Sequence, residues 1–166
     1  MYSIGDKIMY GASGVMTVID IRDEAIGDIS HSYYVMRPTL ARTDSFTFVP
    51  VGNERLVAMM RPLLSKEDIN SLLSAAKDIP SVDWVPENRA RQEYYKKLIE
   101  SGELSSMIAM IHRVIDCGRL REAEGKKNFL SDENAKAKAE RLITSEIAVV
   151  LEIPEDEAKA MLLAAI

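Results

Sequence analysis

The side chains that most often do chemistry in proteins are scarce in this sequence. Among its 166 residues there are one cysteine, Cys117, and two histidines, His31 and His112. These are too few for the usual Cys/His zinc sites, and a single cysteine cannot form an internal disulfide. We therefore predict that Cys117 is a small helix residue, that His112 is packed or at the solvent edge, and that His31 is exposed. No metal site and no cofactor are expected.

Motifs for catalysis or nucleotide binding are also missing. The sequence has no G-x-x-x-x-G-K-[ST], G-x-G-x-x-G, G-x-S-x-G or H-E-x-x-H pattern. Its carboxylates fall mostly at helix starts and in surface patterns, where acidic residues are usual. We expect no catalytic residue and no small-molecule substrate. An enzyme, the alternative, would show a pocket of titratable groups with perturbed pKa values.

The composition is that of a globular protein, with 47% hydrophobic and 28% charged residues. The segment Met1–Asp6 lacks the basic start and apolar run of a signal peptide, and no stretch reaches the roughly 18 apolar residues of a membrane helix. A cytoplasmic monomer without membrane contact is expected. The net charge of −5 is unusual for a strong, unaided nucleic-acid binder, so any DNA contact should be local or assisted by a partner.

The first 64 residues consist of short runs with strand length, separated by turn residues. Pro50 is expected to end a strand because it lacks the N–H that a ladder needs. Several short strands in so few residues predict a small curled sheet or barrel. The strand-like runs are 7–10, 15–21, 33–36, 46–49 and 56–60, and the turns are Gly11–Gly14, Gly27–Asp28 and Thr43–Ser45.

From residue 65 onward the apolar period becomes helical. Ser65 is a candidate N-cap, and Pro154 suits the first turn of a helix. Residues 79–86 interrupt the pattern, because Pro80 and Pro86 bracket Trp84 and disfavour helix before them. The predicted helices are 65–76, 87–100, 104–120, 131–151 and 154 to the end. The expected fold class is α+β, with a β module at 1–64 and an all-α bundle of about five helices at 65–166.

Several segments, in their order and spacing, resemble the CarD/CdnL/TRCF family over essentially the whole chain. The same N-terminal module occurs in a transcription-repair coupling helicase, but that protein needs a Walker loop, which is missing here. The full-length CarD-like arrangement therefore fits better. The matching segments are Ile4–Tyr10, Gly14–Val15, Ile21–Arg22, Tyr33–Met36, Phe48–Asn53, Arg61–Leu63 with Ser65, Trp84, Arg89 and Arg91, Lys97–Leu98, Ser101–Leu104 and Ser145–Ala148.

The resemblance implies a bacterial transcription regulator. Its Tudor-like β module would bind the RNA polymerase β subunit through a strand edge. Its helical module would contact promoter DNA at the upstream edge of the −10 region, where the tryptophan wedges into the minor groove and stabilises the open complex. The polymerase-binding residues expected here are Arg22, Phe48, Val49 and Pro50, and the DNA-binding residues are Trp84, Arg89, Arg91, Lys96, Lys97, Arg119 and Arg121.

The residues themselves leave alternatives open. On the residues alone Trp84 is better explained as a residue of the core or of an interface between the modules, because tryptophan is highly buried on average, whereas the resemblance favours the wedge. Residues 89–127 carry nine basic and six acidic side chains, which suits either weak phosphate contacts or a solvated helix face. A free strand edge takes any β-partner. The β module could instead form an aromatic cage for a modified cation, or the protein could be an adaptor that never touches DNA.

Overall fold

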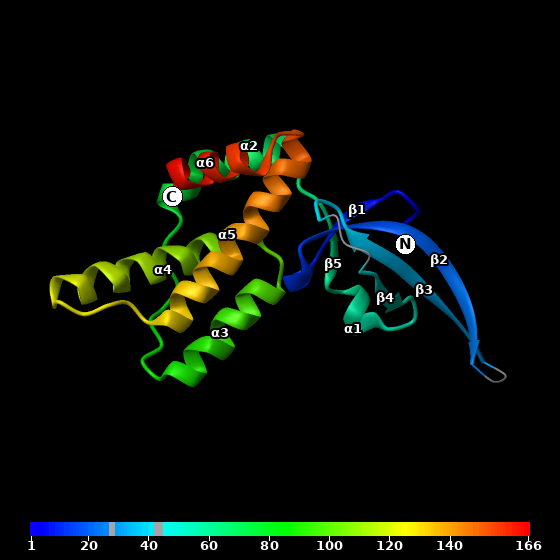
Figure 1. Ribbon diagram of the computed structural model, residues 1–166, viewed down its shortest axis with the longest axis horizontal. Helices are drawn as coiled ribbons and strands as arrows, with labels where there is room; N and C mark the ends of the chain where they lie inside the picture. Colours follow the sequence, from blue (N-terminus) through cyan, green and yellow to red (C-terminus); the bar gives the residue numbers. More distant parts are fainter. Residues whose placement is uncertain (27–28, 42–44) are drawn as a thin grey trace.

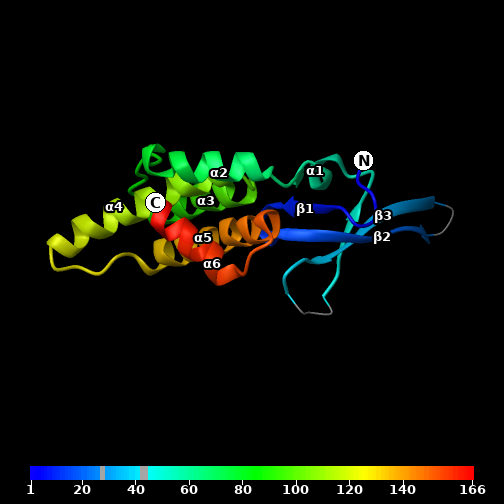
Figure 2. The same ribbon diagram turned by 90° about the horizontal axis from the view of Figure 1, so that it is seen from above.

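The computed structural model describes residues 1–26, 29–41 and 45–166, and it has the predicted α+β class. A five-stranded antiparallel sheet forms one end of the molecule and the helices after residue 65 form the other (Figure 1). Viewed from above, the two parts lie end to end (Figure 2). The predicted turn at Gly27–Asp28 and most of that at Thr43–Ser45 lie outside the described residues.

The sheet has the strand order β4-β3-β2-β1-β5, so among the described residues β4 and β5 are its edges. Strands β2 and β3 are longer than predicted. Together they form a bent ribbon that extends away from the helices (Figure 1). A register shift between Val18 and Asp20 interrupts their pairing. The bounds are β1 Lys7–Tyr10, β2 Val15–Ile26, β3 Ile29–Pro38, β4 Thr47–Pro50 and β5 Met60–Pro62.

The strand predicted at 56–60 is wrong. Residues Glu54–Val57 form a short helix, α1, because the Asn53 side chain accepts a hydrogen bond from the backbone N–H of Leu56 and caps a helical turn there. The fifth strand starts only at Met60. Pro50 does end β4, as predicted.

The predicted helices are confirmed with small changes at their ends. Ser65 caps α2, and Ser65 and Asp68 form a reciprocal capping box. Pro154 stands at the N-cap of α6 rather than inside its first turn. No helix in the described part of the chain is long and apolar enough to cross a membrane. The bounds are α2 Lys66–Ala75, α3 Asn88–Glu100, α4 Leu104–Ala123, α5 Leu130–Leu151 and α6 Glu155–Ala165.

Strand β1 is buried on both faces, which explains why its sequence is a continuous apolar run rather than an alternating one. Ile8 and Tyr10 pack into the core of the sheet. Met9, between them, belongs to the larger core of the helices, and so does Val15 at the start of β2. The sheet and the helices therefore share buried side chains, even though strands give way to helices between Pro62 and Lys66.

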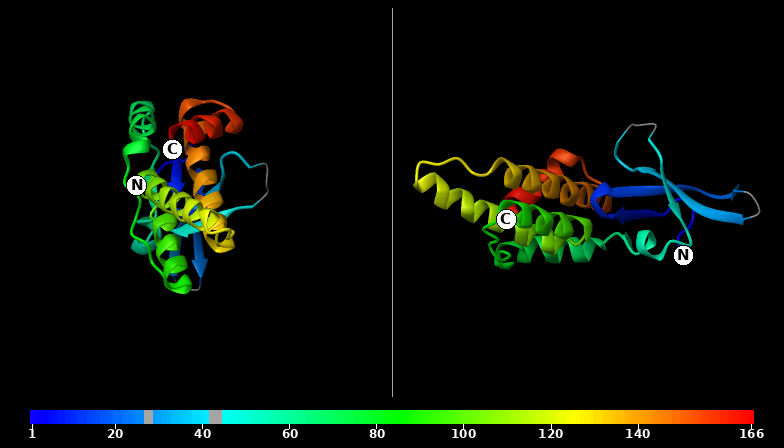
Figure 3. Two further views of the ribbon diagram at one scale, coloured as in Figure 1. Left: turned by 90° about the vertical axis from the view of Figure 1, so that its left-hand side faces the viewer. Right: turned by 90° about the horizontal axis from the view of Figure 1, so that it is seen from below.

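An ion pair lies at this junction. Arg61 of β5 donates two hydrogen bonds to the Glu146 carboxylate of α5, at 2.8 and 2.6 Å, and its guanidinium also donates to the carbonyl oxygen of Gly102. Glu146 is fully buried and accepts a further bond from the N–H of Leu64. The strand end, the α3–α4 turn and α5 are thus fastened together at one point. The right-hand view of Figure 3 shows from below how the sheet and the helices lie end to end.

Candidate functional site

The pairing of the sheet gathers the residues predicted to bind polymerase. Arg22 of β2 lies opposite Tyr33 of β3, which lies opposite Pro50 of β4. Two rows further along, Asp20 lies opposite Val35, which lies opposite Phe48. Because residues two apart share a face, these rows form one face of the sheet. This face lies beside the β4 edge.

This face carries aromatic and charged side chains that are exposed or half-buried. Together with Phe46, which stands just before β4, we call it the β4 face (Asp20, Arg22, Tyr33, Phe46, Phe48 and Pro50). Phe48 and Phe46 are 48% and 52% exposed. Arg22 is exposed and pairs with Asp20 at 3.2 Å. Val49 is a correction: it is fully buried, because it points to the opposite face of β4 and packs in the sheet core. Its side chain is therefore not available to a partner in this structure.

The second predicted site lies at the start of α3, which is close to the start of α5 (Figure 1). Trp84 is half-buried, and its ring stacks on Phe129 with centroids 6.3 Å apart. The Arg91 guanidinium lies over both rings, 4.4 Å from the Trp84 centroid and 4.7 Å from that of Phe129. Arg121 lies over the Phe129 ring at 4.0 Å. We call this group (Trp84, Arg91, Arg121 and Phe129) the tip cluster.

Arg91 corrects the prediction that it contacts phosphate. It is 1% exposed, and its Nε donates to both carboxylate oxygens of Asp132, which is itself fully buried. A phosphate cannot approach a guanidinium that the protein encloses in this way. Sequence analysis missed both Asp132 and Phe129. Phe129 stands between a predicted loop and a predicted helix. An aromatic side chain at this boundary is the signal in the sequence that could have marked Phe129 as a site residue.

The other predicted DNA contacts are accessible. Arg89, Lys96, Lys97 and Arg119 are exposed, whereas Arg121 is half-buried and donates to the carbonyl oxygen of Lys127. Of these, Arg89, Lys96 and Lys97 lie on α3, and Arg119 lies on α4. Lys96 forms a surface ion pair with Glu100 at 3.9 Å. The structure thus provides basic side chains near the tip cluster and along α3, but not one continuous set.

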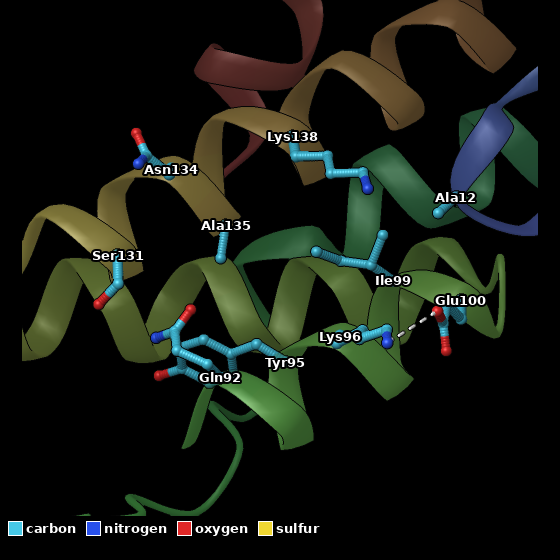
Figure 4. Close-up of a pocket in the computed structure, with 10 residues that line it drawn as sticks. All are labelled: Ala12, Gln92, Tyr95, Lys96, Ile99, Glu100, Ser131, Asn134, Ala135 and Lys138. Atoms are coloured by element: carbon cyan, nitrogen blue, oxygen red, sulfur yellow. Dashed lines mark ion pairs between the residues drawn. The ribbon is translucent and has the colours of Figure 1, made fainter. Parts of the chain in front are cut away.

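A groove of about 410 Å³ runs between α3 and α5 (Figure 4). Its lining includes the apolar side chains of Tyr95, Ile99 and Ala135, with Lys96 and Lys138 on the two helices beside them. Lys138 was not among the predicted basic residues, since it lies beyond the basic stretch considered. The groove thus adds a basic side chain of α5 to those of α3.

The nucleophile and base candidates are packed, as the sequence predicted for Cys117 and His112. Cys117 lies half-buried in α4, and burial raises the pKa of its thiol, which makes it a weaker nucleophile at neutral pH. His112 Nδ1 lies 2.8 Å from the carbonyl oxygen of Ile79. His31 is exposed. Within the described residues, no three His, Cys, Asp or Glu side chains are grouped so as to hold a metal ion.

Tyr95 carries a testable consequence of burial. Its side chain is 1% exposed, and its hydroxyl has no hydrogen-bond partner among the described residues. Burial, with a smaller contribution from Asp132, raises the pKa of Tyr95 to about 12, above its ordinary value of 10.0. Between these two values the unfolded chain has lost the phenolic proton and the folded chain retains it, so stability falls as pH rises.

We expect Tyr95→Phe to leave the free energy of unfolding at neutral pH unchanged or to raise it by up to about 1 kcal/mol, because an unpaired buried hydroxyl is removed. Urea unfolding of both proteins at about pH 9 and about pH 11 measures the pH effect. The variant should lose less stability than the wild type over this range. Equal losses would contradict a buried, neutral phenol at position 95.

No protein-family model matches the chain, and no curated protein matches its sequence. The resemblance to the CarD/CdnL/TRCF family therefore stays a prediction.

Proposed function

We propose that this protein is a transcription regulator that binds the β subunit of bacterial RNA polymerase through the β4 face and stabilises the promoter open complex through the tip cluster. The observation that carries the proposal is the placement of these two surfaces. One carries exposed phenylalanines and lies at a sheet edge, and the other is aromatic and cationic and lies in the helical half. The ion pair of Arg61 with Glu146 joins the sheet to the helices.

The β4 face has the features of a strand-edge docking site. Phe46 and Phe48 are large apolar side chains left in solvent, and such exposed apolar patches commonly mark interaction sites. The backbone of β4 pairs with β3 on one side only among the described residues. A partner strand can therefore add to this edge by backbone hydrogen bonds while the two phenylalanines contribute specificity.

The tip cluster suits a distorted minor groove better than regular B-DNA. Apolar and aromatic side chains that enter a base step help to hold kinked DNA, and nearby arginines are attracted by the negative potential of a narrow groove. Trp84 retains an exposed part, and Arg89 lies exposed five residues further on, at the start of α3. With a net charge of −5, the affinity for free DNA should be weak. Tethering to polymerase would raise the effective concentration at the promoter.

The second candidate is an adaptor that binds polymerase or another partner through the β4 face and does not contact DNA. The specific observation in its favour is that Trp84 is half-buried against Arg91 and Phe129. In this case Trp84 would be a structural residue of the helical half.

The lifetime of open complexes of a bacterial RNA polymerase holoenzyme, measured with a competitor DNA chase, tests the proposal. Wild-type protein should lengthen the lifetime. Phe48→Ser should abolish polymerase binding in a pull-down, whereas Leu163→Ser, an equally exposed side chain on α6, should not. Trp84→Ala should still bind polymerase but lose about tenfold or more of the effect on lifetime, the order expected for one aromatic anchor.

The two candidates give different results in this assay. If Trp84→Ala binds polymerase and lengthens the lifetime as well as the wild type does, the contact of Trp84 with DNA is excluded and the adaptor is favoured. If the wild type does not bind polymerase, both candidates fail in their polymerase form.

A further inference from the structure

The loop that carries Trp84 is fastened at both of its ends. Its first half is held by α4: the N–H of Val82 donates to the carbonyl oxygen of Ala109, and Arg113 donates to the carbonyl oxygen of Val82. Its second half is held by hydrogen bonds from the Arg91 side chain of α3. The Arg91 Nη1 donates to the carbonyl oxygens of Val85 and Pro86, at 3.0 and 3.2 Å.

Every nitrogen of the Arg91 guanidinium is used. Besides the two carbonyl oxygens, Nε binds the Asp132 carboxylate at 3.0 and 3.1 Å, and Nη2 donates to Oδ1 of Asn88 at 3.0 Å. Gln92 donates to the same carboxylate at 2.8 Å. The face of this guanidinium also lies against the Trp84 ring. One planar fork therefore fixes the backbone after Trp84 and supports its ring at the same time.

We propose that Arg91, held by Asp132, is the positioning residue for Trp84, and that it sets the indole in place before any partner binds. The inference deepens the proposed function and rests on it for the partner, which is promoter DNA. Arg91 does not itself touch this partner, because it is enclosed. Its effect is preorganisation: a side chain that is already ordered loses less conformational entropy on binding.

The role of the Arg91–Asp132 pair is better explained by geometry than by stability. A buried ion pair is a poor source of stability, since well-packed apolar residues of similar volume often do as well or better. Such a pair contributes geometry: the carboxylate orients the fork, and the remaining N–H groups can then reach the two carbonyl oxygens. Lysine presents its three N–H donors from one point and cannot reproduce the planar guanidinium that spans Asp132, Asn88 and the loop.

The chain contains one tryptophan, so Trp84 fluorescence reports on this loop directly. The key variant is the double replacement Arg91→Met/Asp132→Leu, which removes both buried charges and keeps the volume filled, so that the protein stays folded. We expect its emission maximum to shift to longer wavelength and its quenching by acrylamide to increase. Arg91→Lys, which keeps the charge, should show the same change. Lys136→Met, which removes a cation from a surface ion pair on α5, should not.

The second readout is binding to a preformed polymerase–promoter complex. The double variant should bind with about tenfold lower affinity. This is the loss expected when one or two more side chains must be ordered on binding. Circular dichroism and urea unfolding confirm that the compared proteins are equally folded.

The fluorescence result decides the inference independently of the proposed function. If the folded double variant and Arg91→Lys keep the wild-type emission and quenching, Arg91 does not position Trp84 and the inference is overturned. If the fluorescence changes but the affinity for the polymerase–promoter complex stays the same, the part of the inference that concerns DNA is overturned. A wild-type protein that fails to bind this complex at all overturns the proposed function, whatever the fluorescence shows.

Discussion

Replacing Glu146 with alanine is expected to lower the free energy of unfolding by about 3 to 5 kcal/mol, the range observed when one partner of a buried ion pair is removed. Glu146 is fully buried, and it accepts hydrogen bonds from the Arg61 guanidinium and from the N–H of Leu64. Without it, these donors lose their partner at a site largely closed to water. The cost is the desolvation of groups left unpaired, added to the lost bonds.

Urea unfolding followed by circular dichroism measures this effect. Lys66→Ala is the control, because Lys66 and Glu152 form an exposed ion pair at 3.7 Å, and its removal should cost no more than about 1 kcal/mol. The double variant Arg61→Met/Glu146→Leu should recover much of the stability, since it leaves no charge unpaired. A loss below about 1 kcal/mol for Glu146→Ala would contradict the buried junction.

The second large effect is expected from Gly11→Ala, which should cost about 2 to 4 kcal/mol. Gly11 lies just after β1, and its φ is 43°. Residues that have a Cβ adopt this left-handed backbone conformation only at a cost in conformational energy. A Cβ there would lie 2.9 Å from the Met59 Cε and 3.1 Å from the carbonyl oxygen of Glu100. The methionine side chain can move, but the backbone oxygen of Glu100, at the end of α3, can move only with the main chain.

Gly5→Ala separates the two causes. Gly5 also has a positive φ, of 96°, but no described atom beyond its two chain neighbours lies within 4 Å of the position a Cβ would take. It should therefore show only the backbone strain, about 1 to 2 kcal/mol. Thermal unfolding of both variants gives the comparison. If Gly11→Ala costs no more than Gly5→Ala, the close approach between the β1 turn and α3 is contradicted.

The local elements of this fold were predictable because their signals are local. The spacing of Ser65 and Asp68 is typical of a capping box and indicates the start of α2. Pro50 ends β4 because it has no N–H for the strand ladder. The strand predicted at 56–60 failed for an equally local reason. The Asn53 cap favours a helical turn over an apolar run that suits either structure.

The environment of the site residues was much less predictable, because it depends on partners that are distant in the sequence. From its residue type, Arg91 is a candidate phosphate contact. It is buried instead because it pairs with Asp132, which lies 41 positions later in the sequence. Arg61 and Glu146 are separated by 85 positions. Val49 and Phe48 are both apolar, and which of them faces solvent depends on the register of β4 against β3.

The sharing of β1 between two cores has a consequence for how the molecule opens. Local unfolding in proteins proceeds by cooperative units, and a strand that is packed on both faces cannot leave one unit without disrupting the other. Met9 and Ile8 of β1 belong to different cores, although they are neighbours in the chain. The slowest-exchanging amide protons of β1 and of α5 should therefore exchange together, through the same opening event.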